Sequence, residues 1–260
     1  MAALKYWVWL ATLPGLGTRT RLQLLEHFDS PEDIYYADEG ELLLTPVITK
    51  AQAALLADKS LERTEQVLAD CARDGQFILT MGDSLYPNRL RTIFDPPILL
   101  YGKGALPMFD DEVAVTVVGT RSCTPYGVRA ASQLGYELSK QGALLVSGMA
   151  KGIDGEALKG ALRAGGFTAA VLGGGADVIY PAENRRLYQD IAATGVVLSE
   201  YPPGTVPKAE HFPVRNRLLS ALSLATVVVE APEKSGALIT ATTALEQGRE
   251  VFAIPGPFDA

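Results

Sequence analysis

From residue 113 onward, the chain alternates short runs of apolar residues with longer stretches of helical periodicity. Continuous runs rich in β-branched residues, separated by helices, are typical of a parallel sheet that is covered on both faces. The pattern predicts an α/β fold, a Rossmann-like doubly wound and mostly parallel sheet. The predicted strands are 113–118, 143–147, 168–172, 196–199, 225–230 and 250–254, and the predicted helices are 125–141, 153–165, 182–194, 213–223 and 237–248.

Residues 1–73 show helical periodicity that no strand-like alternation interrupts. The stretch LPGLG at 13–17 connects two of the predicted helices, as in the small helix-hairpin-helix and SAM-like domains. Its backbone N–H groups could face a phosphate, or its glycines could serve only to make the turn. The predicted helices are 3–12, 18–28, 31–37, 49–58 and 60–73, with Thr18, Ser30, Thr49 and Ser60 as N-caps.

The stretch that joins these two parts contains two further predicted strands, 76–81 and 96–102, which could extend the sheet. We therefore expect a small all-helical SAM/helix-hairpin-helix-like domain over residues 1–73. An extended Rossmann-like domain is expected over residues 74–260.

The composition, 48% hydrophobic, is that of a globular protein, and no apolar run is long enough to predict a membrane span. The N-terminal residues run into helical periodicity without a signal-peptide cleavage site, so we expect a cytoplasmic protein. Cys71, Cys123, His27 and His211 stand in no metal-binding spacing, and we expect neither a metal nor a cofactor.

The formal net charge of −7 is unevenly distributed along the chain. Residues 1–75 carry 7 Lys and Arg against 12 Asp and Glu, whereas residues 113–260 carry 13 against 13. An acidic chain normally argues against a polyanionic partner, because nucleic-acid affinity depends on cations that neutralise phosphates. The neutral second part leaves room for a local basic pocket.

The loops that follow the predicted strands are rich in glycine and small hydroxyl residues. In a doubly wound sheet these loops gather at one rim, where glycine permits close backbone approach and helix N-termini bind anions. A phosphate-bearing ligand is therefore expected. The dinucleotide fingerprint and the Walker A loop are both missing from the sequence, which disfavours a nicotinamide enzyme and an ATPase. The loops are 118–127, 147–156, 173–186, 199–217 and 230–240.

Several cationic side chains occur in these loops, and arginine can grip phosphate oxygens or stack on a base. Each could instead be a surface residue or pair with a carboxylate such as Glu200 or Glu230. In the helix of 213–223, the periodicity places Arg215 in an inward stripe with Val214, Leu218 and Leu222 and turns Asn216 the opposite way. The cations are Arg121, Arg185, Arg186, Lys208, Arg215 and Arg217.

Other residues with reactive side chains have ordinary interpretations. Asp154 lies at the start of a predicted helix and is expected to be its cap rather than a catalytic group. Tyr126 and Tyr180 could stack on bases or simply pack at the rim. Cys123 has no histidine placed by a motif to activate it as a nucleophile. We expect no catalytic residue.

Seven segments, in this order, resemble the signature segments of the DprA/Smf family of DNA-processing proteins. They are GTRSCTPYG, SGMAKGIDGEAL, GGGADVIYPAENRRLY, SEYPPG, FPVRNRLLSALS, VVVEAPEKSGALITA and GREVFAIPG. The resemblance implies an extended Rossmann-like domain that binds single-stranded DNA without sequence preference. It also implies homodimers, and loading of the recombinase RecA onto incoming strands in natural transformation. The family is not known as an enzyme.

Carried over residue by residue, the family's DNA-binding pocket would fall on Gly119, Thr120, Arg121, Ser147, Gly148, Asn184, Arg185, Phe212, Arg215, Asn216 and Arg217, with Ser235 and Gly236 at its rim. The chain departs from the family at Leu158, which stands where a histidine is usual, and this argues against proton transfer by that helix. It also ends at PGPFDA, before the winged-helix module of many relatives, so we expect a short member or a truncated chain.

Two other functions remain open. The stretch SGALITATTALEQG at 235–248 resembles, weakly, the helix of Rossmann-like nucleotide phosphoribohydrolases called lysine-decarboxylase-like, with Glu246 as the glutamate. The match fails at that family's glycines and proline, and release of free base from nucleoside monophosphates would support it. Alternatively, the fold could bind a small anion only to regulate a partner.

Overall fold

The computed structural model describes residues 3–46 and 48–256. The chain forms two compact units, one of Met1–Tyr86 with Phe94–Leu100 and one of Pro87–Ile93 with Tyr101–Ala260. This grouping differs from the predicted boundary at residue 73, because residues 74–86 cluster with the helical part. The predicted division into domains 1–73 and 74–260 stays a prediction. The final segment, whose end led us to expect a short or truncated chain, lies outside the described residues from 257 onward.

The first unit is helical, as predicted, with one strand. Ser30 and Thr49 are confirmed as N-caps, each accepting a hydrogen bond from the third residue of its helix. Thr18 and Ser60 are not N-caps, since Gly17 and Leu61 occupy those positions. Its elements are α1 (Leu4–Thr12), α2 (Thr18–His27), α3 (Pro31–Tyr36), α4 (Glu39–Leu43), α5 (Lys50–Ala57), α6 (Glu62–Asp74) and β1 (Phe77–Thr80).

Helix α4 is missing from the sequence prediction, although its start carries a readable signal. The Asp38 side chain accepts from the backbone N–H of Glu41, and the Glu41 side chain accepts from the N–H of Asp38. This capping box satisfies two backbone donors at once and stabilises a helix of only five residues. A short helix shows too little periodicity for its pattern to be recognised.

The core of the first unit is formed by large apolar side chains from its helices. Trp9 belongs to this core, and its indole N–H donates to the carbonyl of Asp58 at 3.3 Å, so the buried ring keeps its one polar group satisfied. Gly15 has a φ of 79°, a conformation that favours glycine in the turn between α1 and α2. Fully buried partners of Trp9 in this core are Leu10, Leu24, Ile34, Leu42 and Leu56.

The second unit contains the predicted alternation of strands and helices. Two short elements, α7 and η1, are absent from the prediction, and the predicted helix 182–194 is found as η2 followed directly by α10. Its strands are β2 (Leu99–Gly104, which begins in the first unit), β3 (Ala114–Val118), β4 (Leu144–Ser147), β5 (Thr168–Leu172), β6 (Val196–Ser199), β7 (Ala225–Val228) and β8 (Glu250–Ala253). Its helices are α7 (Asn88–Arg91), η1 (Phe109–Asp111), α8 (Pro125–Lys140), α9 (Ile153–Arg163), η2 (Ala182–Asn184), α10 (Arg185–Thr194), α11 (His211–Ala221) and α12 (Gly236–Glu246).

The strand order in this unit is β2-β6-β5-β4-β3-β7-β8. All neighbouring pairs are parallel except β2 and β6, which run antiparallel with Tyr101 opposite Ser199. From β3 the chain proceeds through β4 and β5 to β6, then returns to the other side of β3 to form β7 and β8. The order therefore reverses between β3 and β7, and this topological switch point is where doubly wound sheets bind ligands.

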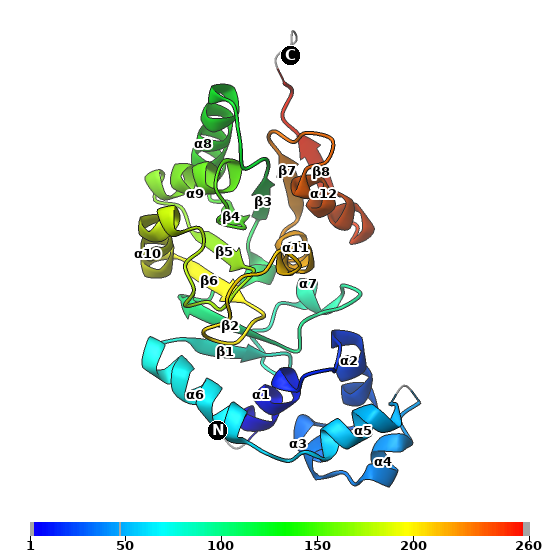
Figure 1. Ribbon diagram of the computed structural model, residues 1–260. Helices are drawn as coiled ribbons and strands as arrows, with labels where there is room; N and C mark the ends of the chain where they lie inside the picture. The colour runs from blue at the N-terminus through cyan, green and yellow to red at the C-terminus, as the bar shows by residue number, and fades with distance from the viewer. Residues whose placement is uncertain (1–2, 47, 257–260) are drawn as a thin grey trace. The chain divides into compact units, whose positions relative to one another are not determined.

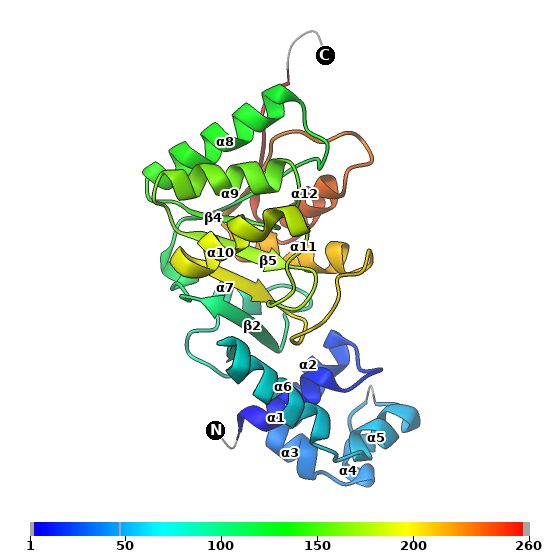
Figure 2. The ribbon, with the colours of Figure 1, turned by 60° about the vertical axis from the view of Figure 1, so that its left-hand side comes forward.

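Helices cover both faces of the sheet (Figure 1). Helices α8, α9 and α10 lie on one face, and α11 and α12 lie on the other, since the chain changes faces when it passes back across the sheet. Figure 2 shows α8 and α9 running side by side. Glycines permit this close approach, because a Cβ on Gly135 would collide with the backbone of Ala157. The predicted doubly wound, mostly parallel fold is confirmed, as is a helical N-terminal region.

A search of the described residues for membrane-spanning helices finds no helix that is both long and apolar enough to cross a bilayer.

Candidate functional site

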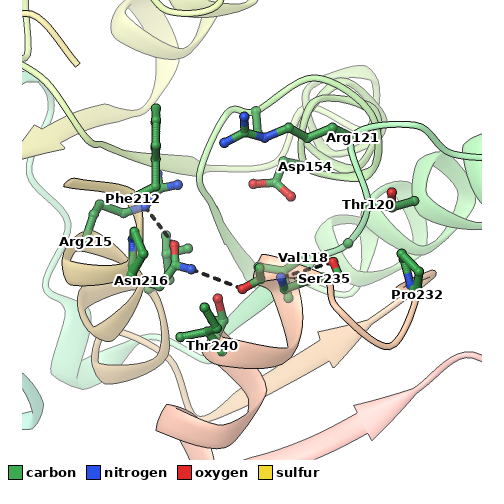
Figure 3. A pocket seen from close by; sticks show the side chains of 17 residues that line it. Val118, Thr120, Arg121, Asp154, Phe212, Arg215, Asn216, Pro232, Ser235 and Thr240 are labelled. Carbon is green, nitrogen blue, oxygen red and sulfur yellow. Dashed lines mark hydrogen bonds between the residues drawn. The ribbon is translucent and has the colours of Figure 1, made fainter. Parts of the chain in front are cut away.

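A pocket of about 310 Å³ opens at the switch point, and we call it the switch-point pocket (Figure 3). Its walls come from the loop after β3, from α11 and from the loop and first turns of α12. These segments lie at the carboxyl ends of the two strands between which the order reverses. Eight of the thirteen residues predicted for the site line this pocket: Gly119, Thr120, Arg121, Phe212, Arg215, Asn216, Ser235 and Gly236.

The other predicted residues do not line the switch-point pocket. Gly148 and Asn184 line neighbouring depressions of the same rim. Ser147 is fully buried and donates its hydroxyl to the carbonyl of Val117 at 2.6 Å, and Arg185 is exposed in the first turn of α10. Arg217 is turned away to an ion pair with Glu200. The DNA-binding role of all thirteen residues stays a prediction.

Arg215 is held inside the protein rather than projecting into solvent. Its side chain is only 5% exposed, and it donates to the carbonyls of Gly148, at 3.0 Å, and of Val171. Desolvation by burial lowers the pKa of Arg215 to about 10, so the guanidinium is still charged at neutral pH. These hydrogen bonds fix the positive charge of Arg215 beside the ends of β4 and β5, at the floor of the pocket, where it favours the binding of an anion.

The loop after β4 is shaped by this arginine. Gly148 leaves space for the guanidinium, because a Cβ at that position would lie 2.7 Å from Cζ of Arg215. The next residue, Met149, is fully buried with a φ of 53°, a left-handed conformation that is unfavourable for a side chain of this kind. Asn184 donates to the carbonyl of Met149 at 2.9 Å and stabilises the unusual turn. Strained backbone of this kind occurs preferentially at functional sites.

Asp154 has a different position from the one predicted. It is not the cap of α9, because Gly152 is the N-cap residue and Asp154 accepts instead from the backbone N–H of Gly148 at 3.1 Å. The carboxyl group is 5% exposed and lines the pocket near Arg215. Burial raises the pKa of Asp154, while the charge of Arg215 acts in the opposite direction. The pocket floor therefore contains both a cation and an acid.

The predicted orientation of α11 is wrong in two respects. Val214, expected in the inward stripe, is 47% exposed, and Asn216, expected to face away, is 9% exposed and lines the pocket. The reason is that α11 is buried on most of its sides, between the sheet and α12, so it has no single inward stripe. Asn216 accepts from Nε of Arg215 at 3.2 Å and donates to the carbonyl of Gly236 at 3.4 Å, which connects α11 to α12 (Figure 3).

Arg217 pairs with Glu200, one of the two carboxylates that the sequence analysis left open as partners for the arginines. Its Nη2 lies 2.9 Å from the carboxylate of Glu200, and the two side chains are 8% and 19% exposed. Because the pair is largely desolvated, it fixes the loop after β6 against α11. Glu230, the other carboxylate considered, accepts from the backbone N–H and the hydroxyl of Thr124.

Arg121 and Phe212 form the outer rim of the pocket. Arg121 is exposed, and its Cζ lies 5.0 Å from the centroid of the Phe212 ring. This cation–π contact holds the guanidinium over the pocket without neutralising its charge. In Figure 3 the Arg121 side chain extends above Asp154 and across the mouth of the pocket. An anion that enters the pocket would therefore meet an exposed cation at the rim and a buried one at the floor.

The wall opposite α11 is the N-terminal end of α12. The Ser235 side chain caps this helix by accepting from the N–H of Ala237 at 3.3 Å, and the positive end of the helix dipole points into the pocket. Thr240, one turn later, is 1% exposed and lines the pocket. Sequence analysis missed Asp154 and Thr240 as pocket residues. The spacing from Gly236 to Thr240, one helical turn, is the signal that could have indicated the latter.

Groups suited to metal binding or nucleophilic chemistry do not gather here. Within residues 3–46 and 48–256, there is no group of three or more His, Cys, Asp and Glu side chains that could hold a metal ion. Burial raises the pKa of Cys123, with a further contribution from Glu230, so its thiol is protonated at neutral pH. The geometry is that of a binding site for an anionic ligand with an aromatic rim.

Comparison with known proteins identifies relatives of this chain. The family model described as DNA recombination-mediator protein A matches residues 77–260. The chain is 40% identical to the DNA processing protein DprA of Bacillus subtilis over 228 residues, which cover 85% of this chain and 77% of that protein. It spans less than two thirds of the length of the other curated relatives it matches.

Two solved structures are also similar. The structure of DprA from Streptococcus pneumoniae matches with a TM-score of 0.83 and 33% identity, covering 98% of this chain and 87% of the other. The structure of DNA processing protein A from Helicobacter pylori, which concerns the single-stranded DNA binding mode of that protein, matches with a TM-score of 0.64 and 34% identity. It covers 70% of this chain and 82% of the other.

Proposed function

Because the chain belongs to the DNA recombination-mediator protein A family, the DprA/Smf proteins, we propose that it binds single-stranded DNA without sequence preference and acts in the processing of incoming DNA during natural transformation. We further propose that it protects the strand and loads RecA onto it. Single-stranded DNA binding by the Helicobacter pylori relative supports the first part. RecA loading rests on the family resemblance.

The observation that carries the proposal is the pairing of Arg121 with Phe212 at the rim of the switch-point pocket. A single strand offers phosphates and unpaired bases, and proteins that bind it without sequence preference combine cations with aromatic faces. Below the rim, Arg215 and the N-terminal end of α12 provide positive potential for a phosphate. Arg121 is exposed and is therefore the residue best placed to respond to DNA.

A titration of oligo(dT) at two or more salt concentrations tests the proposal. Binding by the wild type should weaken as salt rises, with a slope of roughly −0.7 per phosphate neutralised. The Arg121→Ala variant should bind more weakly and show a shallower slope. Arg163→Ala is the matched control, because Arg163 lies at the C-terminal end of α9, away from the strand ends that form the pocket. Equal binding by all three proteins would contradict the pocket assignment.

We also propose that the protein forms homodimers through the edge of its sheet. Strand β8 is the last strand in the order, and its Phe252 is 55% exposed. On the adjacent helix α12, Ile239 and Leu245 are 44% and 64% exposed. An exposed edge strand beside exposed apolar side chains is a surface that a second copy can cover. The residues that would contact RecA stay unassigned.

The phosphoribohydrolase alternative gains no support from the site. Glu246, the glutamate of the weak resemblance, does not line the switch-point pocket. It lies at the end of α12, in an adjoining depression that shares Ser235 and Ile239 with that pocket. A hydrolase of this class would need a carboxylate beside the N-glycosidic bond of its substrate, and the acid of the switch-point pocket is Asp154 rather than Glu246. Incubation of the protein with nucleoside monophosphates should release no free base. The absence of enzymatic activity and the cytoplasmic location stay predictions.

A further inference from the structure

A second depression adjoins the switch-point pocket on the other side of Phe212. It has a volume of about 480 Å³ and shares Arg121, Ala150 and Phe212 with the switch-point pocket. Its remaining walls are the start of the loop after β4 and the segment before η2, which contains Tyr180. We call it the Tyr180 groove. Since the two depressions meet at one aromatic ring, a ligand longer than one nucleotide can occupy both by crossing that ring.

Three side chains pack together where the two depressions meet, Arg121 on Phe212 and Phe212 on Tyr180, with the two rings tilted. The Arg121 guanidinium lies over the Phe212 ring, with its Cζ 5.0 Å from the ring centroid. The ring centroids of Phe212 and Tyr180 are 5.7 Å apart with an interplanar angle of 34°. Tyr180 is 46% exposed although its ring packs against Phe212. The exposed area of the ring is available to a further flat group.

The Tyr180 groove is lined by charged side chains of both signs. Arg121 and Lys151 are both exposed and line it, whereas Glu183 is the carboxylate among its lining residues. Phosphates of a bound strand would be attracted toward the two cations and away from Glu183. A base attached to such a phosphate would then lie toward the aromatic residues. Paired bases have their faces covered by their neighbours in the duplex, so the arrangement suits an unpaired strand.

We propose that a single strand of DNA crosses Phe212 from the switch-point pocket into the Tyr180 groove, stacks an unpaired base on Tyr180 and places the adjoining phosphate beside Lys151. Tyr180 is thus a further binding residue for the strand, outside the set that the family resemblance supplies. The proposal rests on the proposed function, single-stranded DNA binding. It adds a base-stacking contact and a second phosphate contact to that function.

The test compares Tyr180→Leu and Tyr180→Phe with the wild type, using oligo(dT) and an abasic strand of equal length. Loss of a stacked base should weaken oligo(dT) binding by Tyr180→Leu roughly 5- to 100-fold, while Tyr180→Phe stays within about two-fold of the wild type. On the abasic strand, Tyr180→Leu and the wild type should bind equally. A Tyr180 that merely supports Phe212 would instead give the same loss on both strands, and that result would overturn the proposal.

Two further variants complete the experiment. Tyr136→Leu is the control, since Tyr136 is a tyrosine on α8 outside the groove, with its ring 5.9 Å from Nζ of Lys140. Lys151→Ala, a change at an exposed position, should make the slope of log Kd against log salt shallower by about 0.7. An unchanged slope would contradict the phosphate contact of Lys151. This result can be obtained even if a Tyr180 variant fails to fold. Failure of the wild type to bind any single strand would overturn the proposed function itself, whereas normal binding by Tyr180→Leu would overturn only this inference.

Discussion

Gly148 and Arg215 are fitted to each other, because the guanidinium occupies the space that any side chain at position 148 would need. A Cβ there would lie 2.7 Å from Cζ of Arg215, and the carbonyl of the same glycine accepts from Nη1 at 3.0 Å. The loop after β4 and helix α11 are therefore connected at the floor of the switch-point pocket by one residue pair. Changing either member alters the position of a buried charge.

Gly148→Ala should lower the free energy of unfolding by about 1–3 kcal/mol, the usual cost of forcing an extra methyl group into a packed site. Oligo(dT) binding should weaken as well, since Arg215 must shift. The measurement is denaturant unfolding together with the DNA titration. Gly236→Ala is the control, because a Cβ there meets no atom within 4 Å, and its stability should stay within about 0.5 kcal/mol of the wild type. Equal stability of the two variants would contradict the fitted pair.

Arg217 is expected to stabilise the fold rather than to bind DNA directly. Arg217→Ala leaves the carboxylate of Glu200 without its cation. Because the Glu200 side chain is 19% exposed and water can reach it once Arg217 is removed, we expect a loss of about 1–3 kcal/mol in the free energy of unfolding. A double-mutant cycle with Glu200→Ala should show a coupling of at least about 0.5 kcal/mol. Under conditions where the variant is folded, its Kd for oligo(dT) should lie within about two-fold of the wild type. A large loss of binding with unchanged stability would instead assign Arg217 to the DNA contact that the family resemblance implies.

Asp154 should make the stability of the protein depend on pH. Burial raises the pKa of its carboxyl group in the folded state, so the folded protein keeps this proton to a higher pH than the unfolded chain does. The contribution of Asp154 is therefore fully present below the unfolded pKa, about 4, and is lost as pH rises through the folded pKa. Asp154→Asn cannot lose a proton at this position.

The free energy of unfolding of the wild type, measured relative to Asp154→Asn, should accordingly decrease as pH increases above about 4. Equilibrium denaturation across the acidic to neutral range measures this difference directly. Asp190→Asn on the exposed face of α10 serves as the control, since its side chain is 54% exposed. A difference between wild type and Asp154→Asn that stays constant with pH would show that the carboxyl group has the same pKa in both states.

The sequence predicted the sheet well because its strands are short and continuously apolar, as in Val196–Ser199, whose predicted bounds are those of β6. Short elements such as α7 were not predicted, because four residues are too few to show a helical periodicity of apolar positions. The orientation of α11 was wrong because periodicity assumes one buried face, whereas this helix packs on two sides. The sequence alone does not provide the strand order. Without that order, one cannot predict that the loops after β3 and β7 lie next to each other at the switch point.

Some contacts at the site could not be predicted either, because they depend on the tertiary fold. Glu200 was one of two partners considered for an arginine, and only the fold selects it for Arg217. Asp154 was expected to cap its own helix because local geometry offers that bond first. Its actual donor, the N–H of Gly148, comes from the end of β4 and is brought close by the tertiary fold. The family resemblance named eight residues that line the pocket, but it could not separate them from the five that do not, and their role in DNA binding stays a prediction.

The exposed edge at β8 leads to a prediction about self-association. Phe252→Glu places a charge on a side chain of the edge strand that is 55% exposed, so a second copy could cover this surface only by burying an unpaired carboxylate. Analytical ultracentrifugation should find two chains per particle for the wild type and one for Phe252→Glu. Val113→Glu is the control, since Val113 is 59% exposed and immediately precedes β3, at the opposite end of that strand from the pocket. Unchanged dimers of Phe252→Glu would place the interface elsewhere, and a monomeric wild type would exclude the dimer altogether.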